Sequence, residues 1–442
     1  MNVKVNFTNE IGKIKPQHCV NNGPLVGISA QKRSNFDTYK AARIPYARTH
    51  DASEWIDYGG EFVVDIHSIF RDFDANPYDP SSYAFAVTDL YVQRIQEAGT
   101  ETFYRLGERI EHQVMKHRTI VPKDFKKWAV ICEHIIRHYN LGWANGFHYN
   151  IKYWEIWNEP DLDKENVPSH LRKCWSGTDA QFYEFYETAA VHLKKCFPDL
   201  MIGGPAIAHN TGEWLDKFLA HMTENGKKVP IDFFSWHWYG SNPKKIVDRA
   251  KIVREKLDKA GYADAESHLN EWNYVKSWGD EWINCILTMI SLKGSAFNVA
   301  CMCEGQKAGI DMMMYYDASP CAMNGLWDFY TWYPIKGYYS IYAFADIYEL
   351  GTEIRTESDD NDIYVVGAKD ENGKKAVIIS YYTDENDREE KTVNVNMEGY
   401  DGEVTDIYTV DADHDYTVTD TQTSNTVTIT MKPNTFVVLK NR

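Results

Sequence analysis

Residues 153–161 read Tyr153-Trp154-Glu155-Ile156-Trp157-Asn158-Glu159-Pro160-Asp161. The first five are aromatic or aliphatic apart from one glutamate, which is typical of a strand buried in a parallel sheet. Pro160 ends the strand, because proline has no N–H for the ladder and disfavours helix at the residue before it. The segment therefore puts Asn158 and Glu159 at the carboxyl end of a buried strand, where β/α barrels and open α/β sheets keep their chemistry.

Glu159 has two possible roles. In the structural one it caps a loop or pairs with an arginine, as most glutamates do. In the chemical one it is a general acid, because Trp154 and Trp157 surround it with apolar rings that favour the neutral form of a carboxyl group. The strand-end position and the aromatic surroundings together favour the general acid.

Strand and helix patterns alternate on both sides of this segment. Helical periodicity covers residues 122–138, 180–197 and 246–259, among others, and each of these lies between two apolar runs. Eight such strand–helix units predict an α/β fold, the (β/α)8 TIM barrel. We expect the barrel strands at residues 25–29, 44–51, 101–107, 153–158, 200–205, 231–239, 268–273 and 309–317.

The composition changes near residue 350. Short β-branched runs then alternate with turn residues such as Asn372-Gly373, which predicts a small antiparallel β-sandwich over residues 351–442 after a catalytic barrel over residues 21–350. Residues 1–20 alternate as a strand does, and we expect this strand to join the sandwich. The expected sandwich strands are 363–368, 376–382, 391–397, 404–408 and 426–431.

Composition limits the partners of the chain. A net charge of −17 argues against nucleic acid or an anionic membrane, both of which select a basic surface. Aromatic residues make up 14% of the chain, and because rings pack on the apolar faces of sugars, this mildly favours a carbohydrate ligand. There is no apolar segment at the N-terminus and no run of 18 apolar residues, so we expect a cytoplasmic protein without a membrane span.

The eight cysteines have no paired spacing, so we expect free thiols in a reducing compartment and no zinc site. No glycine-rich phosphate loop occupies a strand–helix turn, which argues against a nucleotide cofactor. We therefore expect neither a metal nor a cofactor.

Glu271 is the candidate for a second acid. Retaining cleavage of a glycosidic bond needs a protonated carboxyl group and an ionised one about 5–5.5 Å apart, the second acting as nucleophile. Glu271 ends the seventh expected strand, and strands four and seven lie on opposite sides of an eight-stranded barrel. We therefore predict Glu159 as acid/base and Glu271 as nucleophile, with Glu155 one layer lower in the barrel.

Other strand ends carry residues that we expect to bind substrate. His237 and Tyr239 lie on the strand before Glu271 and could hold it ionised by hydrogen bonding. Histidines and acids at strand ends are also typical of metal-dependent barrels, but an arginine at position 48 would repel the cation. The candidate substrate-binding residues are Arg48, His50, Trp157, Asn158, His237, Tyr239, Trp272, Asp317 and Trp327.

These motifs resemble glycoside hydrolase family 39, one of the clan A families of retaining (β/α)8 enzymes. Asn158-Glu159-Pro160 is similar to the acid/base motif of that family, and Asn270-Glu271-Trp272-Asn273 to its nucleophile strand. The resemblance implies the same two catalytic roles, a sugar-binding His50 and a C-terminal β-sandwich. Further similar segments are Arg48-Thr49-His50, residues 122–128, Gly203-Gly204-Pro205-Ala206 and residues 232–237.

The family includes β-xylosidases and α-L-iduronidases, so the resemblance implies a retaining glycosidase that cleaves terminal glycosides, in the first place β-xylosides. The strand-eight residues Tyr315-Tyr316-Asp317 and the charged Glu108-Arg109 after strand three depart from the xylosidase pattern. Arabinosidase, galactosidase, glucosidase and iduronidase-like specificities stay open; a uronate would need a cation such as Arg48 or Lys307. From another class, a non-catalytic carbohydrate-binding barrel stays open, although it would usually lack one carboxylate. The oligomeric state is open as well.

Overall fold

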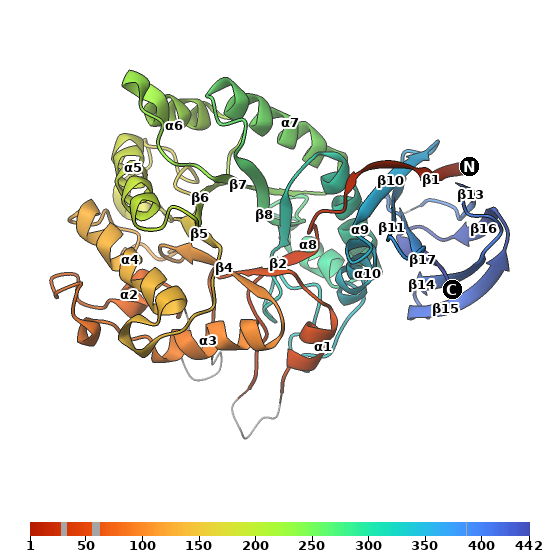
Figure 1. Ribbon diagram of the computed structural model, residues 1–442, viewed down its shortest axis with the longest axis horizontal. Helices are drawn as coiled ribbons and strands as arrows, with labels where there is room; N and C mark the ends of the chain where they lie inside the picture. The colour runs from red at the N-terminus through yellow and green to blue at the C-terminus, as the bar shows by residue number, and fades with distance from the viewer. Residues whose placement is uncertain (28–32, 55–61, 386) are drawn as a thin grey trace.

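Eight parallel strands close into a barrel in the computed structural model, which describes residues 1–27, 33–54, 62–385 and 387–442 (Figure 1). The strands pair in chain order, and β9 closes the barrel by pairing with β2. The predicted (β/α)8 barrel is confirmed. Its strands are β2 (Cys19–Asn21), β3 (Tyr46–Arg48), β4 (Glu101–Leu106), β5 (Tyr153–Ile156), β6 (Met201–Ile207), β7 (Phe233–Gly240), β8 (Glu266–Tyr274) and β9 (Met312–Tyr315).

Helices surround the barrel, and local sequence signals fix their ends. The Asp124 side chain accepts the Lys127 N–H at the start of α4, and Gly142 ends that helix with φ 72°, in the left-handed region. A capping box joins Thr178 and Gln181 at the start of α5. The α-helices are α1 (Phe36–Ala41), α2 (Ile66–Ile69), α3 (Ala86–Glu97), α4 (Phe125–Leu141), α5 (Asp179–Cys196), α6 (Glu213–Thr223), α7 (Lys244–Lys259), α8 (Trp282–Met289), α9 (Leu292–Lys307) and α10 (Tyr338–Tyr348); short 3-10 turns are Pro80–Ser82, Trp143–Asn145, Ser169–Leu171 and Glu224–Gly226.

The first barrel strand differs from its prediction. The structure uses β2 in place of the apolar run 25–29, of which residues 28 and 29 lie outside the described part of the chain. Val26 makes only an isolated antiparallel bridge to Ser34. β2 has three residues, so it is too short to show a period in the sequence, whereas the apolar run after it does show one.

The other nine strands form one sheet. Apolar side chains from these strands pack together in a hydrophobic core of their own. The N-terminal strand β1 lies inside this sheet, antiparallel to β10 and parallel to β13, so the sandwich is mostly but not entirely antiparallel. Three strands, β10, β15 and β17, were not predicted. The sheet order is β15-β14-β17-β12-β11-β10-β1-β13-β16, with β1 (Asn2–Lys13), β10 (Thr352–Ser358), β11 (Ile363–Lys369), β12 (Lys375–Tyr381), β13 (Lys391–Glu398), β14 (Val404–Val410), β15 (Asp415–Thr423), β16 (Thr426–Met431) and β17 (Thr435–Asn441).

Helices α9 and α10 lie between the barrel and the C-terminal sheet (Figure 1). Nearly every residue of α9 is buried, and the Ser380 hydroxyl of β12 donates to the Ala296 carbonyl of α9 at 2.9 Å. Among the described residues no single helix is long and apolar enough to cross a membrane; only α8 and α9 taken together reach that length and composition, and they meet at an 80° bend.

Candidate active site

A cavity of about 590 Å³ opens at the carboxyl ends of the barrel strands. Six of the residues predicted from the sequence line it: His50, Asn158, Glu159, His237, Tyr239 and Glu271. The other lining residues are Asp51, Ile110, His112, Leu162, Lys173, Ala208, His209, Trp238, Trp278, Tyr316 and Met323. Strand-end residues far apart in the sequence therefore meet in one hollow, as a barrel requires.

Glu159 follows β5 in a backbone conformation that few side chains adopt, with φ 44°. Its N–H donates to the carbonyl of Ala206, near the carboxyl end of β6, at 2.9 Å. Next to it, the two oxygens of Asp161 accept the N–H groups of Ala208 and His209. These bonds fix the acid to the neighbouring strand. Burial raises the pKa of Glu159 to about 7, so a large share of its carboxyl groups is protonated at neutral pH.

Glu271 sits near the end of β8 with a cation and a hydroxyl on its two oxygens. Arg48 Nη1 donates to Oε1 at 2.7 Å, and the Tyr239 hydroxyl donates to Oε2 at 2.8 Å. His50 Nε2 lies 3.6 Å from Oε1. An adjacent guanidinium and a hydrogen bond both favour the charged form of a carboxyl group. Glu271 thus has a guanidinium and a hydroxyl donor on its carboxyl oxygens, whereas burial is the main influence on Glu159.

The two acids face each other across a short gap. Carboxylate oxygens of Glu159 and Glu271 and a ring nitrogen of His237 all lie within 4.8 Å of one another. His237 Nδ1 is 2.7 Å from Glu159 Oε1 and 3.4 Å from Glu271 Oε2, and burial lowers the pKa of His237 to about 4, so the ring is neutral. A metal ion would fit these three atoms by distance, but the Arg48 guanidinium on Glu271 opposes a second cation there.

Beneath the cavity, Arg48 ties the strand ends together. It is fully buried and donates to Glu155 Oε2 at 2.6 Å and to the Asn158 Oδ1 at 2.7 Å, in addition to Glu271. Glu155 also accepts from Ser235 at 2.6 Å and from Asn270 at 2.5 Å. Arg48 and Glu155 therefore belong to a polar layer below the cavity. This layer holds Asn158 and Glu271 in position.

Four residues predicted to bind substrate lie elsewhere. Trp157 is buried and donates to the Cys174 carbonyl, and Trp272 packs edge-on against Tyr315. Trp327 stacks on Tyr39 and donates to the Thr38 hydroxyl. The Asp317 carboxylate accepts from the Asn22 amide and the Ser319 N–H. The three indoles and this acid are core and loop residues here, because strand-end position alone does not fix the direction of a side chain.

Several lining residues were not among the predicted binding residues. Lys173 lies on the long loop between β5 and α5, where no local sequence pattern marks it, and His209 lies just after the end of β6. Asp51 and Tyr316 lie close to predicted residues, and the Tyr316 hydroxyl donates to Asp51 at 3.4 Å. Burial raises the pKa of Asp51 to about 7. Trp278 contacts Tyr239 edge-on, with ring centroids 5.1 Å apart. A tryptophan shortly after an expected strand end is a signal that the sequence does contain.

A (β/α)8 barrel with two carboxyl groups facing each other in a cavity at the strand ends has the architecture of a glycoside hydrolase. The family model described as glycosyl hydrolases family 39 matches residues 1–277, which include both acids. The chain belongs to this family.

Known relatives agree with the assignment. A beta-xylosidase of Caldicellulosiruptor saccharolyticus is 26% identical over 308 residues, covering 64% of this chain and 57% of that protein. One of Geobacillus stearothermophilus is 27% identical over 248 residues, covering 49% and 46%. The match thus spans about half the length of these curated relatives.

Solved structures agree in fold over the whole chain. A glucosidase of Croceicoccus marinus has a TM-score of 0.80 at 22% identity, covering 100% of this chain and 99% of that one. A monomeric beta-xylosidase of Caulobacter crescentus has a TM-score of 0.70 at 15% identity, covering 99% of each chain.

Proposed function

We propose that this protein hydrolyses terminal β-glycosides, in the first place β-xylosides, with retention of anomeric configuration. The observation that carries the proposal is the gap between Glu159 and Glu271, whose oxygens lie within 4.8 Å. Retaining enzymes hold their carboxyl groups about 5–5.5 Å apart, whereas inverting enzymes need about 6.5–9.5 Å to admit a water molecule. The gap supports direct attack by one acid on the sugar.

In the first step Glu271 attacks the anomeric carbon while Glu159 gives its proton to the leaving oxygen. Arg48 and Tyr239 support the ionised nucleophile, and burial supports the protonated acid. The bond from the anomeric carbon to the leaving oxygen breaks as the bond to Glu271 forms. The products of this step are a glycosyl-enzyme and the free aglycone alcohol.

In the second step the ionised Glu159 takes a proton from water, which attacks the anomeric carbon and releases Glu271. The neutral His237 ring on Glu159 Oε1 fixes the orientation of that carboxyl group through both steps. Two inversions at one carbon give net retention.

The sugar is inferred from the relatives. Both curated relatives are named beta-xylosidases, and the similarly folded Croceicoccus marinus protein is named a glucosidase, so glucosides are the first competing class. A uronate is disfavoured: Arg48 lies under Glu271, and Lys307 pairs with Glu304 on α9 at 3.2 Å. Among the described lining residues Lys173 is the only lysine or arginine.

The test is a panel of aryl β-xylosides, β-glucosides, β-galactosides, α-L-arabinosides and α-L-iduronides, with the configuration of the first product followed by NMR. We expect the β-xyloside to be the best substrate and the β-anomer to appear first. Glu271→Gln should lower kcat/KM at least about a hundredfold, and Glu159→Gln should lower it most for aglycones that leave poorly. Glu304→Gln, in α9 outside the cavity, is the matched control.

An inverted first product would exclude the two-step mechanism. A lack of turnover on every glycoside of the panel would favour the non-catalytic carbohydrate-binding barrel, whereas unchanged turnover in both variants would exclude Glu159 and Glu271 as the catalytic pair. A better rate on another glycone would correct the sugar while leaving the mechanism in place.

A further inference from the structure

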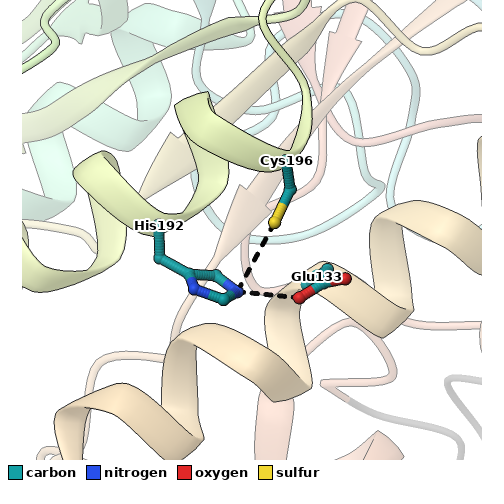
Figure 2. A group of neighbouring side chains, drawn as sticks. All are labelled: Glu133, His192 and Cys196. Atoms are coloured by element: carbon teal, nitrogen blue, oxygen red, sulfur yellow. Dashed lines mark hydrogen bonds and ion pairs between the residues drawn. The ribbon is translucent and has the colours of Figure 1, made fainter.

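A second cluster of chemically active side chains lies on the outside of the barrel, between α4 and α5. His192 and Cys196, one turn apart on α5, point toward Glu133 on α4 (Figure 2). His192 Nε2 lies 2.8 Å from Glu133 Oε2 and 3.8 Å from the Cys196 Sγ, and one such atom from each of the three residues lies within 4.8 Å of the other two. One ring nitrogen thus faces both an oxygen and a sulfur.

This set of atoms suits a thiophilic divalent cation. Imidazole, thiolate and carboxylate are the three side-chain ligands of zinc in proteins, at about 2.0–2.3 Å. Tetrahedral placement around one ion would put neighbouring ligand atoms roughly 3.3–3.7 Å apart, so the nitrogen–oxygen and nitrogen–sulfur distances here need to change by about half an ångström or less. All three residues are partly exposed, which gives an ion a path to the site and leaves room for water as a fourth ligand.

The surroundings prepare Glu133 for such a role. Arg137 Nε donates to Glu133 Oε1 at 2.7 Å, which orients the carboxylate and leaves Oε2 directed at His192. Ligating carboxylates are commonly held by an outer hydrogen bond of this kind. Burial and the Glu133 carboxylate raise the pKa of the Cys196 thiol, against the opposing effect of Arg137 and Lys195, so a metal ion has to displace the thiol proton.

We propose that Glu133, His192 and Cys196 form a binding site for a thiophilic divalent metal ion, Zn²⁺ in the first place, that links α4 to α5. Binding releases the thiol proton to solvent and leaves His192 neutral with Nε2 on the ion. The ion would restrain α4, which follows β4, and α5, which follows β5; Glu159 lies in the segment between β5 and α5. The site does not depend on the glycosidase function and takes no part in its chemistry.

The chain contains a matched control. His221 on α6 lies 2.8 Å from Glu187 Oε2 on α5, the same distance as between His192 and Glu133. The third group there is Lys227, whose Nζ is 2.7 Å from the same oxygen and cannot bind a cation. His221 Nδ1 also lies 3.5 Å from Glu224 Oε1, which pairs with Lys227. Both places thus hold histidine and glutamate, and only the first holds a thiol.

The experiment uses the full chain freed of metal with a chelator. Zn²⁺ affinity is measured by competition with a chromophoric chelator, and Co²⁺ is added separately to look for the charge-transfer absorption of a cobalt–thiolate bond. We expect one Zn²⁺ per chain, a thiolate band with Co²⁺, and a rise in Tm on metal addition. Cys196→Ser should abolish the band, and His192→Ala should lower the affinity by more than the 10–100-fold typical of losing an outer hydrogen-bond partner. His221→Ala should change neither the cobalt–thiolate band nor the Zn²⁺ affinity.

The proposal is overturned if Cys196→Ser binds Zn²⁺ as tightly as the original chain, or if no thiolate band forms. In either case the cluster is an ion pair with a neighbouring thiol. Circular dichroism of each variant checks that it folds, and the cobalt band distinguishes loss of the site from loss of the fold.

Discussion

At the scale of single residues, we expect Glu159 to set the alkaline limit of activity. Its pKa is raised to about 7 by burial, against the opposing effect of Arg48, His209 and Lys173. The first step needs the protonated acid, so kcat/KM should fall as pH rises through the pKa of Glu159. Lys173→Met removes a positive charge that favours the carboxylate. We therefore expect the pKa of Glu159 to rise and the alkaline limb of the pH profile to move to higher pH.

Lys173→Arg keeps the charge and is the control for this shift. The pH dependence of kcat/KM is measured on one aryl glycoside for the original chain, Lys173→Met and Lys173→Arg. An alkaline limb that stays in place in Lys173→Met would show that this lysine does not act on the acid.

Loss of the Arg48 side chain should cost several kcal/mol of stability. It is fully buried and bonded to two carboxylates, Glu155 and Glu271. Removing one partner of a buried ion pair leaves uncompensated charge at a cost of about 3–5 kcal/mol. We expect Arg48→Met to lower the free energy of unfolding by about that amount in urea titrations. Arg355→Met, which breaks an exposed pair with Glu357, should have little effect, and equal losses in both would contradict the prediction.

The sequence predicted the two acids but not the full lining of the cavity, for a physical reason. Glu159 comes shortly after β5 and Glu271 lies near the end of β8, so the topology of a barrel brings both to the same end of the sheet. Asp317 also follows a strand, yet its carboxylate accepts bonds from Asn22 and Ser319 instead of facing the cavity. Lys173 is carried into the cavity by a long loop. Loop paths depend on tertiary contacts that no local pattern records.

At the scale of elements, the loop between β8 and α8 supplies an aromatic surface at the cavity. Trp278 is 61% exposed, lines the cavity and stacks on Trp282 with ring centroids 5.2 Å apart. Indole faces pack on sugar rings, and aromatic contacts of this kind contribute about 0.5–1.5 kcal/mol. We expect Trp278→Ala to raise KM for a disaccharide roughly 2–12-fold with kcat nearly unchanged.

Trp278→Phe keeps a ring and should recover part of the loss in steady-state kinetics on the same disaccharide. An unchanged KM in Trp278→Ala would mean that the indole does not contact the substrate.

Helices and strands could be predicted from the sequence where their hydrophobic periodicity extends over many residues. Helices α4, α5 and α7 show sustained apolar periodicity, and each was expected within a few residues of its observed bounds. Strand β15 is exposed along almost its whole length, so its sequence has no alternation to detect. Strand β17 does carry an apolar run, Phe436-Val437-Val438-Leu439, so the sequence held a strand signal there that the prediction did not use.

At the scale of the whole molecule, the N-terminus holds the C-terminal sheet together. β1 is hydrogen-bonded to β10 on one side and to β13 on the other, so it joins two parts of the sheet that share no other ladder within the described part of the chain. The first residues of the chain thereby complete a sheet whose other strands all follow residue 350. Helices α9 and α10 connect that sheet to the barrel (Figure 1).

Substitutions in β1 test this role, because neighbouring residues face opposite sides. Val5 is 1% exposed in the sheet core, while Lys4 is exposed. Val5→Asn removes apolar burial worth about 1.5–3 kcal/mol and leaves an unsatisfied buried amide that costs about 1–3 kcal/mol more. We expect the free energy of unfolding to fall by roughly 3–6 kcal/mol in Val5→Asn and to stay nearly unchanged in Lys4→Asn. Because α9 packs on β11 and β12, glycosidase activity should be lost on heating together with the sheet, at a lower temperature in Val5→Asn. If activity survives to the same temperature in both variants, the barrel is stable without the sheet, and the N-terminal strand serves the sheet alone.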